Sequence, residues 1–185
     1  MAHVSVPMEE QQQLKEEHEQ NFNIISSDGV NFPVSEKIVR QSQVLSEMLD
    51  IQGSSAHEGK MDIPVKDVSS KVLQKVIEFC QHYESEEPYI PPTGPNACVS
   101  TPPEDHWDIV FLKKLSSPEL HEVICAANYL NISRLIDACC YRLGYMIQGR
   151  TVEEIRRIFQ IKNDFTKEEE EALRKEHLWY SELEK

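Results

Sequence analysis

Short apolar runs alternate with polar residues on either side of Asp28-Gly29. This pattern predicts a β-hairpin, because an Asp-Gly pair tolerates the positive φ angles of a tight turn. Pro33 lacks a backbone N–H and therefore favours an edge position or a strand end. A further alternating run with an internal proline, Pro64, predicts another short strand. The alternating residues are Phe22 and Ile24, then Val30, Phe32 and Val34, and later Met61, Ile63 and Val65.

Apolar residues at a spacing near 3.6 predict a series of helices in the middle of the chain. The first is expected as one helix, capped by Ser35 and reaching Leu49. Another is capped by Ser69 or Ser70, and a third lies around Trp107. Ser117, followed by a proline, is expected to cap the next one. Asn131 is expected to end that helix. The next helix is predicted over residues 132–147, and Gly149 follows its end.

Two segments have a composition that disfavours regular structure. Residues 1–20 are polar and acidic, and we expect a disordered tail. Residues 84–106 hold six of the chain's ten prolines, so we expect a long, exposed and disordered insertion there. About 65 patterned residues precede it, which is marginal for a separate core. The insertion is therefore assigned to one domain, residues 21–149.

Residues 150–185 differ from the preceding domain, because they predict two short helices whose apolar residues have no core of their own. Thr151 with Glu154, and Thr166 with Glu169, match the capping-box pattern. They predict two short helices, over about 152–160 and 167–180. A segment of this size cannot bury its own apolar residues, so these must lie on the preceding domain or on another protein. The residues are Ile155, Ile158, Phe159, Ile161, Phe165, Leu173, Leu178 and Trp179.

The charge excludes some classes of partner. Asp+Glu 32 against Lys+Arg 19 gives a net charge of -13, which repels nucleic acid and anionic membrane surfaces. No apolar run approaches the roughly 20 residues of a membrane-spanning helix. The first twenty residues lack the apolar region of a secretory signal. The five cysteines are then expected to stay reduced, in a cytoplasmic or nuclear protein.

The sequence offers little chemistry for catalysis. His121-Glu122-Val123-Ile124-Cys125 resembles a helical zinc-protease signature, but Cys125 stands where the second histidine belongs, and a third ligand is lacking. The 6 glycines form no phosphate-binding loop. We therefore expect no catalytic residue, no metal, no cofactor and no enzymatic activity.

The order of elements and several short motifs together resemble one known family. The predicted order is hairpin, helix, strand, helix, insertion and further helices, which indicates an α+β chain. This order resembles the BTB/POZ fold, in which helices pack a small mixed sheet; the resemblance implies a BTB/POZ-like fold here, with a C-terminal two-helix extension. Closer similarity is to the Skp adaptors of Skp–cullin–F-box ubiquitin ligases, from about Phe22 to Trp179. The motifs are Ser26-Ser27-Asp28-Gly29, Ala126-Ala127-Asn128-Tyr129-Leu130, Glu153-Glu154-Ile155-Arg156 and Ile161-Lys162-Asn163-Asp164-Phe165-Thr166, with Arg174-Lys175-Glu176 after the glutamate run.

The resemblance implies a non-catalytic adaptor with two partners. Asn128 and Tyr129 match the family's cullin-contacting positions; a core role for Tyr129 at a helix end is the alternative. The C-terminal helices would bind the F-box of a substrate receptor, unless the tail folds back on its own domain. The F-box-binding residues would be Leu143, Ile147, Ile155, Ile158, Phe159, Ile161, Phe165 and Trp179.

Other functions stay open on these residues. A BTB-type scaffold could self-associate, or join an assembly, without ubiquitin transfer, and the free protein could form a weak homodimer. An elongin C-type adaptor is disfavoured, because such chains stop before residues 151–179. Thr151-Val152 replaces the Thr-Pro of many relatives, which together with the long N-terminal tail suggests a divergent paralogue.

Overall fold

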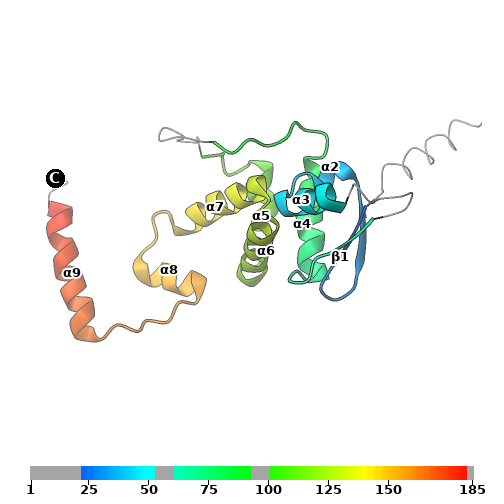
Figure 1. Cartoon of the computed structure of the whole chain (residues 1–185). Helices are drawn as coiled ribbons and strands as arrows, with labels where there is room; N and C mark the ends of the chain where they lie inside the picture. Colours follow the sequence, from blue (N-terminus) through cyan, green and yellow to red (C-terminus); the bar gives the residue numbers. More distant parts are fainter. Residues whose placement is uncertain (1–21, 53–60, 93–100, 183–185) are drawn as a thin grey trace, which may run out of the picture. The chain divides into compact units, whose positions relative to one another are not determined.

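The structure, a computed structural model, describes residues 22–52, 61–92 and 101–182, with side chains as far as Glu176 (Figure 1). The predicted disordered tail, residues 1–20, lies outside this part. The chain divides into two compact units, one ending at Tyr145 and the other beginning at Met146. None of the described helices is long and apolar enough to cross a membrane.

The first unit opens with a three-stranded mixed sheet in the order β2-β1-β3. Strands β1 (Phe22–Ile25) and β2 (Asn31–Val34) pair antiparallel, and β3 (Met61–Pro64) runs parallel to β1. Gly29 adopts a φ of 79° in the turn, where a residue without a Cβ is favoured. The predicted hairpin and the predicted third strand are both confirmed.

Both outer strands of the sheet contain a proline. Pro33 lies in β2, at the edge, as predicted. The Val65 amide donates to the Ile25 carbonyl at 2.8 Å, so the nitrogen of Pro64, one residue earlier, faces away from β1. A proline there leaves no outward N–H for a further strand, which protects that edge from strand addition.

The helices of the first unit follow the predicted order. They are α2 (Glu36–Val39), α3 (Gln43–Gln52), α4 (Ser70–His82), α5 (Trp107–Lys113), α6 (Ser117–Leu130) and α7 (Ser133–Ile147), whose last two residues belong to the second unit. Helix α4 packs against α6 and α2, and α6 also packs against α3. The Ser35 side chain caps α2, as expected.

Two helix starts differ from the prediction. The expected single helix from Ser35 to Leu49 is wrong, because the chain breaks between α2 and α3. At the break, the Ser42 hydroxyl donates to the Leu130 carbonyl at 2.5 Å and accepts from the Leu45 amide at 3.1 Å, which caps α3. Helix α6 begins one residue earlier than predicted, with Ser116 rather than Ser117 as its N-cap.

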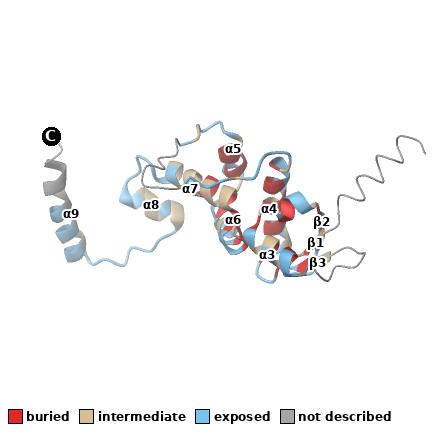
Figure 2. Cartoon of the chain, turned by 45° about the horizontal axis from the view of Figure 1, so that its top comes forward, coloured by how far each residue is buried: buried red, intermediate tan, exposed pale blue. Residues whose placement is uncertain are grey.

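The core lies between the sheet and helices α4, α5 and α6, which carry about half of the buried residues drawn in red in Figure 2. Leu73 and Phe79 of α4, and Leu112 of α5, have no exposed surface. Cys80 is buried in the same core, and burial raises the pKa of its thiol to about 12. The largest fully buried side chains are Phe79, Ile24, Ile63, Leu73, Ile109, Leu112, Leu130, Ile132, Leu135, Val34, Val39 and Val123.

The proline-rich insertion is attached to the first unit at both of its described ends. After α4, the Tyr89 hydroxyl donates to Asp137 of α7 at 2.7 Å, and Arg134 lies 3.9 Å above the Tyr83 ring. Before α5, the Tyr145 hydroxyl donates to the Pro102 carbonyl at 2.5 Å. The expectation of disorder throughout 84–106 is therefore wrong for residues 84–92 and 101–106. Residues 93–100 lie outside the described part.

Candidate functional site

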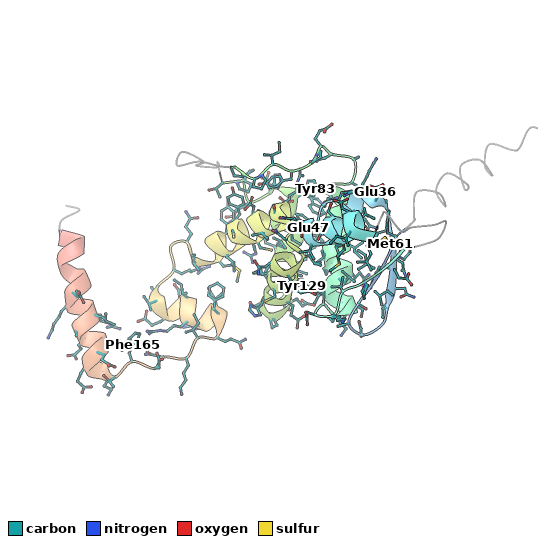
Figure 3. The ribbon with its side chains drawn as sticks, viewed as in Figure 1. Glu36, Glu47, Met61, Tyr83, Tyr129 and Phe165 are labelled. Atoms are coloured by element: carbon teal, nitrogen blue, oxygen red, sulfur yellow. The ribbon has the colours of Figure 1, made fainter. Side chains whose placement is uncertain are left out.

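Two neighbouring residues at the end of α6, the polar Asn128 and the aromatic Tyr129, face solvent. The helix turns its other side to the core, where Ala126, Ala127 and Leu130 are buried. Tyr129 is 40% exposed, so the alternative role as a core aromatic is not what the structure shows (Figure 3). We call Asn128 and Tyr129 the α6 end surface. A half-exposed tyrosine brings apolar area and a polar tip to an interface at a low entropic cost.

Hydrogen bonds connect the end of α6 to the start of α3. Asn131 ends α6 in the left-handed conformation, with φ 49°, and its side-chain amide donates to Gln43 at 2.6 Å. The backbone N–H of Gln43 in turn donates to the backbone carbonyl of Asn131 at 3.2 Å. These bonds tie two segments that lie 88 residues apart in the sequence. Sequence reasoning missed this contribution of α3, since nothing local in Gln43 indicates its distant partner.

The segment from His121 to Cys125, which resembled a zinc-protease signature, has some side chains in the core and others at the surface. Val123 is 1% exposed, whereas His121 and Cys125 lie on the solvent side of α6, with 3.7 Å between Nε2 and Sγ. These two ligands have no third beside them, and the described residues include no group of three His, Cys, Asp or Glu side chains placed to hold a metal ion. The described part of the chain therefore offers no candidate metal centre.

A cavity of about 550 Å³ lies in the first unit between α2, the segment after α4 and the start of α7. Its walls include Glu36 and Tyr83, which lie near one another in Figure 3. The charges on the walls are mostly paired: Arg40 contacts Glu36 at 3.2 Å, and Arg134 contacts Glu86 at 2.6 Å. None of the predicted binding residues lines this cavity.

The second unit contains the two predicted C-terminal helices, α8 (Val152–Phe159) and α9 (Lys167–Glu182). Both predicted capping boxes are present. Thr151 and Glu154 exchange hydrogen bonds of 3.3 and 2.9 Å, and Thr166 and Glu169 exchange bonds of 3.3 and 2.8 Å. These amide donors lower the pKa of both glutamates. The local sequence therefore sets both helix starts without help from a core.

The described apolar side chains of the second unit, which extend to Glu176, are not buried. Between residues 146 and 176 the structure describes every side chain, and none is in the buried class. Ile147 is 43% exposed, Ile161 55% and Phe165 47%; Phe165 lies in the segment between α8 and α9 (Figure 3). Ile155, Ile158 and Phe159 are partly exposed on α8, as is Leu143 on α7 in the first unit. The side chain of Trp179 lies outside the described residues.

Among the described side chains, charged residues connect α8 with α9. Arg156 contacts Glu170 at 3.5 Å and lies 5.7 Å from the centre of the Phe165 ring. Arg174 contacts Glu153 at 3.2 Å. Arg174 and Glu153 are both exposed, and an exposed ion pair contributes only about 0–1 kcal/mol, whereas the Arg156–Glu170 pair is partly buried. The described apolar side chains between residues 146 and 176 keep part of their surface accessible to another protein.

Comparison with known proteins shows which family this architecture belongs to. A family model described as "Skp1 family, tetramerisation domain", a POZ domain, matches residues 20–85, and one described as "Skp1 family, dimerisation domain" matches residues 133–180. A "Skp1-related protein" of Caenorhabditis elegans is 41% identical over 163 residues, which cover 87% of this chain and 92% of the relative. The chain belongs to the Skp1 family. The predicted BTB/POZ-like α+β fold is thereby confirmed.

Other Skp1-family relatives are similar over the same extent. "SKP1-like protein 12" of Arabidopsis thaliana is 42% identical over 156 residues, covering 84% of this chain and 93% of the relative. A protein of Aspergillus flavus, named "E3 ubiquitin ligase complex SCF subunit sconC", is 40% identical over 154 residues, covering 83% and 92% respectively. All eight predicted F-box-binding residues fall within the matched range 133–180, whereas Asn128 and Tyr129 fall outside both matched ranges.

Proposed function

We propose that this Skp1-family chain is a non-catalytic adaptor of a Skp–cullin–F-box ubiquitin ligase, acting in the cytoplasm or nucleus. In this proposal the α6 end surface binds a cullin, and the apolar side chains near the C-terminus bind the F-box of a substrate receptor. Support comes from the relatives, since a protein 40% identical over most of the chain is named as an SCF subunit.

The observation that carries the proposal is the unburied apolar surface between residues 146 and 176. Exposed apolar residues concentrated on a short amphipathic helix are typical of a surface that binds another protein. On α8 they recur at Val152, Ile155 and Phe159, on one face of the helix. Ordering the two helices costs conformational entropy, which burial against an F-box would offset.

A truncation after Gly149 tests whether the F-box and the cullin bind two different surfaces of the chain. It removes α8 and α9 and leaves the α6 end surface, Asn128 and Tyr129, in place. We expect F-box binding to be abolished and cullin binding to stay within a few-fold of the full chain, measured by surface plasmon resonance. Retained F-box affinity would refute the assignment of the C-terminal helices.

The reciprocal variant is Asn128→Ala with Tyr129→Ala. It should weaken cullin binding and spare F-box binding, because both side chains are exposed and outside the core. Equal loss of both partners would indicate unfolding instead. Recovery of the F-box protein without any cullin, in purifications of the full chain, would favour the alternative of a BTB-type scaffold that acts without ubiquitin transfer.

A further inference from the structure

Two hydroxyl residues in the sequence are followed directly by proline: Thr101-Pro102 and Ser117-Pro118. Proline-directed protein kinases take serine or threonine in this context and bind it in an extended conformation. Proline favours that conformation in the residue before it, because its ring disfavours the helical region there. The two dipeptides are therefore equal candidates by sequence, and the structure distinguishes them.

The backbone is accessible at only one of these two dipeptides. Thr101 is exposed and lies outside any helix or strand, in the described end of the insertion that leads to α5. Ser117 is the first residue of α6, inside the capping box formed by Ser116 and Glu119. The Ser116 carbonyl accepts from the Leu120 amide at 2.8 Å. Presenting Ser117 in extended form would break these helical bonds, whereas presenting Thr101-Pro102 leaves every helix intact and displaces the side-chain bond from Tyr145 to the Pro102 carbonyl.

A cationic side chain lies on the part of α7 that contacts the Thr101 segment. Tyr145 donates its hydroxyl proton to the Pro102 carbonyl at 2.5 Å, and Arg142 lies three residues earlier on the same helix, hence on the same face. Arg142 is near enough to Glu104 for the glutamate charge to raise its pKa, although burial, the larger effect, lowers it. Arg142 and the residues around Thr101 therefore lie in one neighbourhood.

The guanidinium of Arg142 lacks an acceptor for one of its donors. Its Nε atom is buried, and no residue in the described part of the chain accepts a hydrogen bond from it. A buried donor without a partner is unusual and costs free energy. Guanidinium groups pair strongly with phosphate oxygens, through two parallel hydrogen bonds where the geometry allows. The site thus favours a phosphate arriving at the neighbouring segment.

We propose that Thr101 is a phosphorylation site of a proline-directed protein kinase, and that its phosphate pairs with Arg142. The Thr101 hydroxyl oxygen attacks the γ-phosphorus of ATP, the bond to the β-phosphate oxygen breaks, ADP leaves, and the hydroxyl proton passes to the kinase's base. The product carries a charge of about −1.5 to −2 and three acceptor oxygens. The added ion pair holds the end of the insertion on α7.

The first test is a kinase reaction on the purified full chain. The chain is incubated with ATP and a purified mitogen-activated protein kinase, and phosphate is located by peptide mass spectrometry. We expect Thr101 to be modified at least about fivefold faster than Ser117, since opening a capped first turn costs about 1 kcal/mol or more. Thr101→Val should remove this phosphate. Equal rates at the two residues, or an unmodified Thr101, would overturn the site.

The second test measures the pairing with Arg142 in the phosphorylated chain. A ³¹P NMR titration reports the second pKa of the phosphate, and a nearby guanidinium lowers it. Arg142→Gln should decrease the proton dissociation constant of the phosphate by about threefold to tenfold. Lys114→Gln, at an exposed position at the end of α5, is the control for loss of one charge. Arg142→Lys keeps the charge and should give an intermediate value, and circular dichroism verifies folding. An unchanged pKa in folded Arg142→Gln would overturn the pairing.

Discussion

Replacing Phe165 with alanine should weaken F-box binding without weakening the fold of the first unit. The side chain is 47% exposed in the segment between α8 and α9. A phenylalanine buries about 150–250 Å² when fully covered, so about 100 Å² remains available to a partner. At about 25 cal/mol per Å², covering it contributes about 2.5 kcal/mol. That amounts to about 70-fold in the dissociation constant.

Two measurements on the purified full chain separate binding from stability. Titration calorimetry against a purified F-box protein should give the loss of about 70-fold for Phe165→Ala. Ile90→Ala is the matched control, because Ile90 is 84% exposed but outside the predicted binding residues, and its affinity should stay near that of the wild type. Urea unfolding of the first unit should shift by less than about 0.5 kcal/mol for either variant, because Phe165 belongs to the second unit and Ile90 is largely exposed. An unchanged affinity for Phe165→Ala combined with a clear loss of stability would refute the reasoning, since Phe165 would then serve its own fold.

Three further predictions concern the first unit. Tyr129→Ala should weaken cullin binding about tenfold to a hundredfold, as expected for an exposed aromatic anchor, with F-box binding unchanged in the same plasmon-resonance assay. The hydroxyls of Ser26 and Ser70 lower the pKa of Asp28 from 3.8 to about 2. The ionised carboxylate therefore stabilises the fold above pH 3.8, and this contribution is lost as the pH falls towards 2; urea midpoints of Asp28→Asn should show less dependence on pH across that window. Tyr83 donates to Asp108, the one charged side chain in the buried class among the described residues, so Tyr83→Phe should cost about 1–3 kcal/mol in urea unfolding, and an unchanged midpoint would contradict that role.

Local patterns were sufficient for several parts of the fold. The turn at Asp28-Gly29 needs a positive φ, and Gly29 supplies it. The capping boxes at Thr151 and Thr166 use bonds between residues three apart, which the sequence displays directly. At these three positions each decisive feature joins near neighbours, and the sequence pattern and the structure agree.

Contacts between distant residues could not be predicted in this way. The break after α2 depends on the Ser42 hydroxyl and a carbonyl 88 residues away, so an apolar pattern that fits one long helix was misleading. The attachment of the insertion depends on Tyr89 and Tyr145 meeting Asp137 and Pro102, respectively. Proline density indicates a lack of regular backbone bonding, but it does not exclude side-chain contacts of this kind.

The candidate surfaces show the same contrast. The shortage of burial near the C-terminus could be inferred from the size of the segment and its apolar content alone. The exposure of Tyr129 could not be inferred from the sequence, because the packing of α6 against α3 and α4 decides which residues of α6 face the core.

The central claim is that the apolar side chains between residues 146 and 176 lack a partner in the free chain and are covered by an F-box. Hydroxyl-radical footprinting with mass spectrometry measures the exposure of such side chains directly, in the full chain alone and in complex with an F-box protein. We predict that Ile155, Ile161 and Phe165 oxidise readily in the free chain and several-fold more slowly in the complex. Equal, slow oxidation in both states would contradict the account, since those side chains would then already be covered by the chain itself.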